Sequence, residues 1–343
     1  MIDNKLRTIR VGVVGCGYWG PQLIRNFQSL HGADMAVVSD LSAARLEHIH
    51  GLYPSAHTTT DYAELLASPV EAVAVATPVR THYRMAREAL LHGKHVLVEK
   101  PLTCDAAQAQ ELVSLAAERG LVLMVGHTFE YNPAVQYLKN YIASGQLGEV
   151  YYINCTRVNL GIFQKDINVI WDLAPHDVSI LLYLLGSQPD RVSARGAAYV
   201  QPQIEDVAYV TLNFPTGVMA DIRVSWLDPC KIRSITVVGS RKMVVYDDVE
   251  PTEKIKIYDK GVDRPAYSDT MEEFRLSYRY GDITTPAIAT AEPLALECAH
   301  FCECVREGKT PRSDGRVGWQ VVRILELAQR SLKNGGCTET ISA

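Results

Sequence analysis

Apolar residues in the first third of the chain follow a regular alternation. Short, continuously apolar and β-branched runs are separated by amphipathic segments with helical spacing, several of which end in glycine. Runs of this kind are typical of strands that are buried on both faces of a parallel sheet. The five runs are residues 9–15, 35–40, 72–78, 95–101 and 121–126. The alternation predicts an α/β domain with a doubly wound sheet.

Beyond residue 127 the pattern changes. A predicted helix and a strand lead into the run WDLAPHDVSILLYLLG, and alternating strand patterns separated by the turn signals PTG and GSRK follow. The strands are expected at 149–159, 205–214, 218–226, 232–238 and 243–248, and the helices at 132–148, 294–308 and 317–336. We therefore expect two domains, an α/β domain at 1–126 and an α+β domain with a mostly antiparallel sheet at 127–343.

Composition narrows the class of protein. The 343 residues carry a formal net charge of −5 without long runs of one sign, which gives no support to nucleic-acid or membrane-surface binding. The first apolar segment is too short for a signal peptide and no later run approaches a membrane span, so we expect a cytoplasmic protein. The eight scattered cysteines predict free thiols. Cys298, His300, Cys302 and Cys304 do not share one helix face, so no metal site is expected.

The first chemical motif is VGVVGCGYWG, in which Gly15, Gly17 and Gly20 form a G-x-G-x-x-G pattern between a strand and a helix. In this context the first glycine permits a tight turn, the second the close approach of a pyrophosphate, and the third close helix–strand packing. The N-terminus of the helix then attracts the phosphates. The motif predicts a dinucleotide site, with Tyr18 and Trp19 in the same loop.

A carboxylate at the end of the second strand bears on the choice of dinucleotide. Asp40 can accept hydrogen bonds from the adenosine ribose hydroxyls and would repel a 2′-phosphate. Leu41 and Ser42, which follow it, bring no arginine to such a phosphate, whereas Arg45 lies within reach. We therefore expect NAD as the cofactor, with NADP as the alternative and Leu41 beside the ribose.

Two later strand ends carry further polar residues. Ligands bind beyond the C-terminal ends of strands in an open parallel sheet, which places Thr77, Pro78, His82, Glu99 and Lys100 at the cofactor. Lys100 has two interpretations. Its ammonium group either donates to the nicotinamide carboxamide or a substrate hydroxyl and relays a proton, or forms an ion pair with Glu99 or a neighbour.

Five motifs spread along the chain are GCGYWG, Asp40, ATPVRTH, EKP and DLAPHD. Together they resemble the glucose–fructose oxidoreductase / inositol dehydrogenase (Gfo/Idh/MocA) family, and the similarity runs over essentially the whole chain. The resemblance implies an N-terminal Rossmann domain and a C-terminal domain whose open sheet often forms the subunit contact, so we expect a homodimer or homotetramer. It also implies hydride exchange between a nicotinamide and a carbohydrate or cyclitol carbon. The family's motif lysine falls on Lys100, and its D-x-x-x-H pair falls on Asp172 and His176.

The local sequence around this pair predicts its geometry. If Asp172 caps a helix that starts at Leu173, Pro175 lies in the first turn, where its missing N–H costs no hydrogen bond. Asp172 and His176 then project from the same side of the helix. His176 would act as the general base, and Asp172 would orient it or bind a substrate hydroxyl.

The competing interpretation makes Asp172 a simple helix cap and His176 a satisfied core histidine. Lys100 and the cofactor motif favour catalysis over that interpretation. Pro175 follows an alanine where many members of the family place glycine, which leaves open whether His176 or Lys100 is the main base. Asp177 is expected to help at the helix start or to face solvent.

Three further residues are expected to bind substrate. Tyr131 follows the last strand of the first domain, near His127 and Glu130, and Arg157 and Asn159 precede DLAPHD. The segments DLAPHD and SWLDPCKIR resemble relatives that act on C3 of a nucleotide-linked sugar or aminosugar. We therefore expect an NAD-dependent dehydrogenase of a small-molecule carbohydrate. The alternatives are a cyclitol dehydrogenase, a ketosugar reductase and a non-catalytic NAD-binding regulator.

Overall fold

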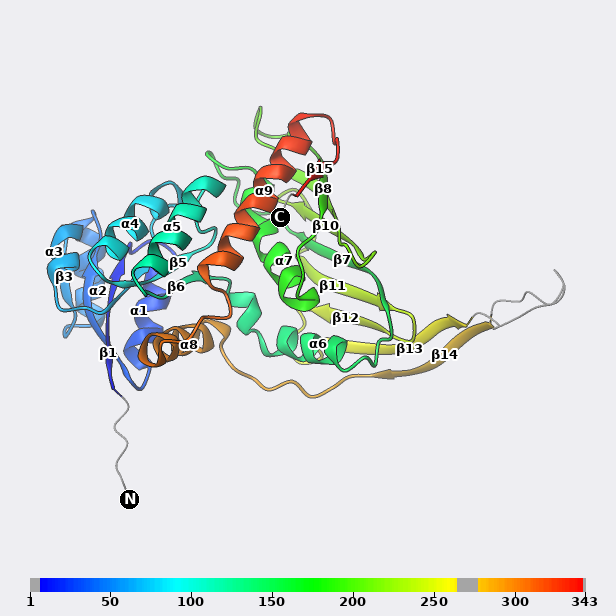
Figure 1. The fold of residues 1–343 in the computed structure, drawn as a ribbon, viewed down its shortest axis with the longest axis horizontal. Coiled ribbons are helices and arrows are strands. Elements are labelled where there is room, and N and C mark those ends of the chain that lie inside the picture. The colour runs from blue at the N-terminus through cyan, green and yellow to red at the C-terminus, as the bar shows by residue number, and fades with distance from the viewer. Residues whose placement is uncertain (1–6, 264–276, 342–343) are drawn as a thin grey trace, which may run out of the picture. The chain divides into compact units, whose positions relative to one another are not determined.

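The computed structural model describes residues 7–263 and 277–341 (Figure 1). The chain divides into two compact units. The first unit comprises residues 1–132 and 291–323, and the second comprises residues 133–290 and 324–343.

This division differs from the single boundary expected after residue 126. The contacts assign residues 291–323 to the first unit, because α8 (Pro293–Glu307) packs against α1 (Gly20–Ser29) and the short helix η1 (Thr128–Tyr131). Phe301 of α8 lies in the same apolar core as Phe27 of α1, with the two rings edge to face at 6.4 Å.

The first unit contains a parallel sheet with the strand order β3-β2-β1-β4-β5-β6. The strands are β1 (Ile9–Val14), β2 (Ala33–Ser39), β3 (His57–Thr59), β4 (Ala72–Val75), β5 (His95–Glu99) and β6 (Leu123–Gly126). The helices between them are α1, α2 (Ala43–Leu52), α3 (Tyr62–Ala67), α4 (Val79–Leu91) and α5 (Ala106–Glu118). This order is that of a Rossmann domain, and it reverses between β1 and β4, which is where domains of this kind bind their ligands. The predicted doubly wound α/β domain is confirmed.

The second unit contains a nine-stranded sheet with the order β14-β13-β12-β11-β7-β10-β9-β8-β15. The pair β7–β10 is parallel and the other pairs are antiparallel, which confirms the predicted, mostly antiparallel sheet. The strands are β7 (Val150–Val158), β8 (Arg191–Ala197), β9 (Val207–Asn213), β10 (Met219–Ser225), β11 (Ile232–Gly239), β12 (Met243–Asp247), β13 (Ile255–Asp263), β14 (Ser277–Thr284) and β15 (Glu339–Thr340).

Helices cover this sheet from the side that carries its core. Helix α7 (Val169–Leu185) packs against β7, β9 and β10, and α6 (Pro133–Ala143) packs against β12 (Figure 1). Helix α9 (Gly315–Lys333) runs from the first unit into the second. The strands alternate as a half-covered sheet requires: in β9, Ala208 and Val210 are buried while Tyr209 between them is exposed.

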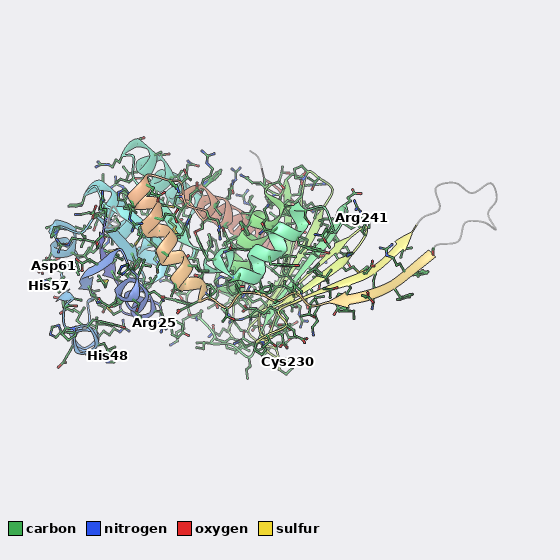
Figure 2. The ribbon with its side chains drawn as sticks, turned by 90° about the horizontal axis from the view of Figure 1, so that it is seen from below. Arg25, His48, His57, Asp61, Cys230 and Arg241 are labelled. Carbon is green, nitrogen blue, oxygen red and sulfur yellow. The ribbon has the colours of Figure 1, made fainter. Side chains whose placement is uncertain are left out.

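All eight cysteines are free thiols, and Cys230 lies at the surface (Figure 2). His300, one of the four residues considered as metal ligands, accepts a hydrogen bond at Nε2 from the backbone N–H of Arg312. In residues 7–263 and 277–341, no group of three or more His, Cys, Asp or Glu side chains is placed to hold a metal ion. None of the helices that the structure describes is long and apolar enough to cross a membrane.

Candidate active site

The loop between β1 and α1 contains three glycines. Two of them are required because a side chain would clash with the backbone, and the third faces open space. Gly15 has a φ of +97°, and a Cβ there would lie 2.6 Å from the carbonyl oxygen of Ala76. A Cβ on Gly20 would lie 1.9 Å from the carbonyl oxygen of Gly15. A Cβ on Gly17 would meet no atom of the described chain within 4 Å. The backbone at Gly17 therefore faces open space, where a phosphate can approach it closely.

The N-terminus of α1 adjoins this loop. Within the described chain, its N-cap residue Trp19 makes no side-chain cap hydrogen bond, and the first helical turn carries no acidic residue. Uncapped N–H groups and the positive end of the helix dipole suit an anion. The side chains of Tyr18 and Trp19 are 82% and 40% exposed, so both can contact a ligand in the loop.

Asp40 is held in one orientation just after β2. Its Oδ2 accepts a hydrogen bond from the backbone N–H of Cys16 at 2.6 Å, and its Oδ1 accepts one from Ser42 at 2.8 Å. The guanidinium of Arg45 lies 3.7 Å from Oδ2 and is therefore paired with the carboxylate. Leu41 is exposed beside it. A fixed carboxylate tied to the glycine loop, together with the open backbone of that loop, fits the adenosine ribose and pyrophosphate of NAD.

His82 joins the loops that follow β4 and β5. Its Nδ1 lies 2.8 Å from the carbonyl oxygen of Pro101 and its Nε2 lies 2.7 Å from that of Thr77. Burial lowers the pKa of His82, while the two backbone carbonyl oxygens that face its ring nitrogens act in the opposite direction. The expectation that His82 contacts the cofactor is corrected accordingly, because both ring nitrogens face the backbone. Thr77 and Pro78 stay candidates at the end of β4.

Buried ionisable groups adjoin Lys100, which is itself partly exposed. The backbone N–H of Lys100 donates to Oε2 of Glu99 at 3.3 Å, and burial raises the pKa of Glu99 to about 7 against the opposing effect of the Lys100 ammonium group. Burial, and after it the charge of Lys100, lowers the pKa of His127 to about 3. Neither ring nitrogen of His127 has a hydrogen-bond partner in the part of the chain that the structure describes.

Glu297 on α8 belongs to the same group, although the sequence pattern did not single it out. Its side chain is fully buried, and its Oε2 accepts a hydrogen bond from the hydroxyl of Thr128 at 2.8 Å. Burial, and after it the charge of Glu99, raises the pKa of Glu297 well above its usual value. The signal in the sequence is a lone carboxylate on the apolar face of LALECAHF, beside the buried Leu294 and Cys298.

In the second unit, α7 begins earlier than predicted. Its N-cap is Asn168, whose Oδ1 accepts a hydrogen bond from the backbone N–H of the third helical residue at 3.3 Å. The expectation that Asp172 caps a helix starting at Leu173 is wrong. Val169 and Ile170 are fully buried, so the helix extends one turn further to place them in the core.

The predicted catalytic pair lies within this helix. Asp172 and His176 are four residues apart on α7 and therefore project from the same side. Oδ2 of Asp172 accepts a hydrogen bond from the indole N–H of Trp226 at 2.9 Å. Pro175 is inside the helix rather than in its first turn. Lys100 belongs to the first unit and the pair to the second, so their meeting in one site stays a prediction.

Arg157, expected to bind substrate, is used in the interior instead. Its side chain on β7 is 5% exposed, and its Nε and Nη2 donate to the two carboxylate oxygens of Asp177 at 2.9 and 3.0 Å. The expectation for Asp177 is wrong for the same reason, because its side chain is 2% exposed and faces the sheet. This ion pair fastens α7 to the strand beneath it.

Tyr131, which was also expected to bind substrate, lies in the interior as well. It is 2% exposed within the apolar core of the first unit, and its hydroxyl lies 3.3 Å from Oγ of Ser313. Asn159, by contrast, is partly exposed at the start of the segment between β7 and α7, where its backbone N–H donates to the carbonyl oxygen of Ser225 at 3.2 Å. Asn159 therefore stays a candidate substrate ligand.

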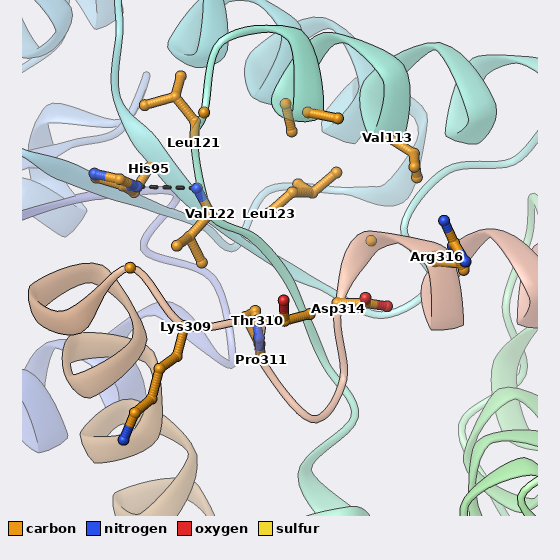
Figure 3. Close-up of a pocket in the computed structure, with 15 residues that line it drawn as sticks. His95, Val113, Leu121, Val122, Leu123, Lys309, Thr310, Pro311, Asp314 and Arg316 are labelled. Carbon is orange, nitrogen blue, oxygen red and sulfur yellow. Dashed lines mark hydrogen bonds between the residues drawn. The ribbon is translucent and has the colours of Figure 1, made fainter.

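A cavity of about 570 Å³ lies at the edge of the parallel sheet where β5 and β6 begin, opposite the edge where the strands end (Figure 3). His95, at the start of β5, lines it and accepts a hydrogen bond at Nδ1 from the backbone N–H of Val122 at 2.9 Å. The loop between α8 and α9 supplies Lys309 and Asp314 to the same cavity. The predicted cofactor and catalytic residues do not line it, so it is separate from the carboxyl edge of the sheet.

Comparison with known proteins agrees with this geometry. Residues 9–127 match the model of the Gfo/Idh/MocA oxidoreductase family with an NAD-binding Rossmann fold, and residues 135–245 match the C-terminal domain of that family. The UDP-N-acetylglucosamine 3-dehydrogenase of Acidithiobacillus ferrooxidans is 30% identical over 92% of this chain and 94% of its own. A solved structure of that enzyme has a TM-score of 0.79, with 26% identity over 95% of this chain and 98% of its own. The NAD(+)-dependent scyllo-inositol 2-dehydrogenase of Bacillus subtilis is 28% identical over 88% of each chain. The chain therefore belongs to the Gfo/Idh/MocA family of NAD-binding oxidoreductases.

Proposed function

We propose that the protein is an NAD-dependent dehydrogenase that oxidises the secondary alcohol at C3 of a nucleotide-linked sugar or aminosugar. The observation that carries the proposal is the Asp172–His176 pair on α7, in a chain whose first unit has a loop and a carboxylate that fit NAD. The similarity to UDP-N-acetylglucosamine 3-dehydrogenase supports the substrate class.

Five of the predicted site residues have assigned roles in this reaction. NAD, when bound, accepts the hydride that leaves the substrate carbon. The backbone at Gly17 and the carboxylate of Asp40 hold its pyrophosphate and adenosine ribose. The ring of His176 takes the proton of the substrate hydroxyl, and Asp172 orients the ring or the substrate. The ammonium group of Lys100 donates a hydrogen bond to the same hydroxyl and so favours its deprotonated form.

A cyclitol dehydrogenase is the second candidate. The similarity to scyllo-inositol 2-dehydrogenase, at 28% identity over 88% of this chain, supports it. The same residues serve either substrate, and they also serve a ketosugar reductase that runs the reaction in the opposite direction. A non-catalytic NAD-binding regulator would have no need of Lys100, Asp172 and His176 together.

The test is a substrate screen. Purified protein is offered NAD or NADP with UDP-sugars, free aminosugars and inositols, and NADH absorbance is followed in both directions. Turnover with a nucleotide sugar, with the new carbonyl at C3 by NMR, supports the proposal; turnover with inositols alone transfers it to the second candidate. Lys100→Ala and His176→Ala should lose turnover, and Lys309→Ala, an exposed residue paired with Glu307, is the control. NAD binding without turnover in either direction favours the regulator.

We further propose that the protein is a cytoplasmic homodimer or homotetramer that associates through the nine-stranded sheet. Tyr209, Tyr152 and Met219 are 55%, 43% and 42% exposed, and the last two are register neighbours on β7 and β10. Large exposed apolar side chains on neighbouring strands are typical of a surface that another chain covers. The free thiols fit a reducing compartment. Light scattering at assay concentration measures the state, and a monomer would contradict this proposal.

A further inference from the structure

We propose that Trp226 is a positioning residue of the candidate active site, whose indole N–H fixes the carboxylate of Asp172 while its ring and backbone fix the segment 159–163 that precedes α7. The inference rests on the proposed function, because it assigns Asp172 and His176 to catalysis. It adds a residue outside the D-x-x-x-H motif to the machinery.

The hydrogen bond between Trp226 and Asp172 fixes both partners. Trp226 is 1% exposed at the end of β10, and its Nε1 lies 2.9 Å from Oδ2 of Asp172. An indole has one N–H donor and no acceptor, so a buried tryptophan needs an acceptor in one particular direction. Losing that acceptor would leave the donor unsatisfied, which is costly in the interior. The ring therefore holds Asp172 in one rotamer, one helical turn from His176.

The backbone of Trp226 holds the adjacent segment. Its carbonyl oxygen accepts a hydrogen bond from the N–H of Gly161 at 2.8 Å, and its own N–H donates to the carbonyl oxygen of Asp206 at 2.9 Å. The N–H of Asn159 donates to the carbonyl oxygen of Ser225 at 3.2 Å. Two successive hydrogen bonds thus continue the pairing of β7 and β10 beyond the end of the sheet.

The indole ring packs against the same segment. A Cβ on Gly161 would lie 3.0 Å from Cδ1 of Trp226, and the ring of Phe163 lies 5.7 Å from the indole at an angle of 60°. Leu160 and Ile162 are 72% and 83% exposed. Gly161 and Phe163 are therefore directed at Trp226, whereas Leu160 before them and Ile162 between them are directed at solvent. The side chain of Trp226 therefore positions both the carboxylate of Asp172 and the segment that contains the candidate ligand Asn159.

A purely structural Trp226 would behave differently when it is replaced. If the ring only filled the core, Trp226→Phe would lower the melting temperature and leave kcat unchanged in the protein that remains folded. If it positions Asp172, the variant loses kcat even where it is fully folded, because the carboxylate loses the hydrogen bond from the indole N–H. The effect also disappears once Asp172 itself is removed.

The kinetic experiment compares Trp226→Phe, Asp172→Asn and the double variant, with Trp319→Phe as control. Trp319 lies on α9 in the first unit, where the guanidinium of Arg323 lies 5.3 Å from its ring. We expect Trp226→Phe to lower kcat about 10- to 100-fold with the KM for NAD unchanged. The double variant should be no worse than Asp172→Asn alone, and Trp319→Phe should keep wild-type kcat. A wild-type kcat in folded Trp226→Phe, or a fully multiplicative loss in the double variant, would overturn the inference.

A second measurement does not depend on turnover. The indole N–H of Trp226 is assigned in a ¹⁵N-edited NMR spectrum as the peak missing from Trp226→Phe, or by selective labelling where that variant fails to fold. Asp172→Asn should shift this peak, and Gly161→Ala should shift it as well because the added methyl group meets the ring. An unmoved peak in both variants would overturn the inference. Wild-type protein without turnover on any substrate would refute the proposed function instead, while the two peak shifts would still report the contact.

Discussion

Replacing Arg157 by methionine should destabilise the second unit without acting on the substrate. The side chains of Arg157 and Asp177 are 5% and 2% exposed, and two hydrogen bonds join them. Methionine keeps part of the volume of the arginine side chain but leaves the carboxylate buried without its cation, which typically costs about 3–5 kcal/mol. At roughly 2–4 °C per kcal/mol for a unit of this size, the melting temperature should fall by roughly 6–20 °C.

Circular dichroism against temperature measures the change, and two further variants separate its causes. Arg157→Met/Asp177→Leu removes both charges and should recover most of the loss, because no charge remains buried alone. Arg87→Met breaks an ion pair with Glu111 whose partners are 43% and 46% exposed, so its melting temperature should stay close to that of the wild type. Kinetics below all transitions should show an unchanged KM for the substrate in Arg157→Met. A wild-type melting temperature with a raised KM would refute this reasoning and make Arg157 a substrate ligand, as its place in the sequence first suggested.

Three further predictions follow from the first unit. Gly17→Ala should fold with a wild-type melting temperature and bind NAD more weakly by calorimetry, because its Cβ occupies only the open space of the loop. Gly20→Ala should fail to fold or melt far earlier, and equal behaviour of the two variants would contradict the packing argument. Asp40→Ala should raise the ratio of NADP to NAD turnover, since it removes the charge that repels a 2′-phosphate; an unchanged ratio in a folded, active variant would count against Asp40 at the ribose. The pKa of Glu99 rises from 4.5 to about 7 on folding, so its protonated form stabilises the fold at low pH, and this contribution is lost as the pH rises through about 7. The melting temperature of Glu99→Gln should therefore fall less than that of the wild type between these two pH values, and parallel curves would show that Glu99 does not titrate there.

The sequence predicts best those strands whose residues are buried on both faces of the sheet, because such strands appear as a short apolar run. Apart from the exposed Arg10, the run at 9–15 is apolar because β1 lies between two helical layers, and the strand is recognisable from that pattern. β14 shows no such pattern: seven of its eight residues are exposed, so neither alternation nor an apolar run marks it. Strand pairing rather than side-chain burial forms β14, and pairing with β13 depends on a partner that the local sequence does not reveal.

The residues of the candidate site also fall into two groups, those that the local sequence predicts and those that depend on a distant partner. The close packing at Gly15 and Gly20, the open backbone at Gly17 and the place of Asp40 after β2 were predictable because they depend on backbone space and on strand ends, which the local sequence encodes. The role of Arg157 was not predictable, since its partner lies 20 residues away on a different element. The hydrogen bond between Asp172 and Trp226 spans 54 residues, and that between Thr128 and Glu297 spans 169. A polar residue in the sequence is equally compatible with a ligand and with such a distant partner, and only the fold decides between them.

The attachments of α7 show why these distant partners matter for the site. Pro175 removes an N–H from the middle of the helix, between Asp172 and His176, and so weakens the hydrogen bonding of the turn that carries the predicted catalytic pair. Side chains on either side of the proline hold that turn in place: Trp226 binds Asp172 before it, and Arg157 binds Asp177 after it. Both partners come from strands of the same sheet, β7 and the end of β10, which are parallel neighbours. The sheet therefore supplies the rigidity that the helix lacks at this turn, and the position of His176 depends on two residues that need not contact the substrate.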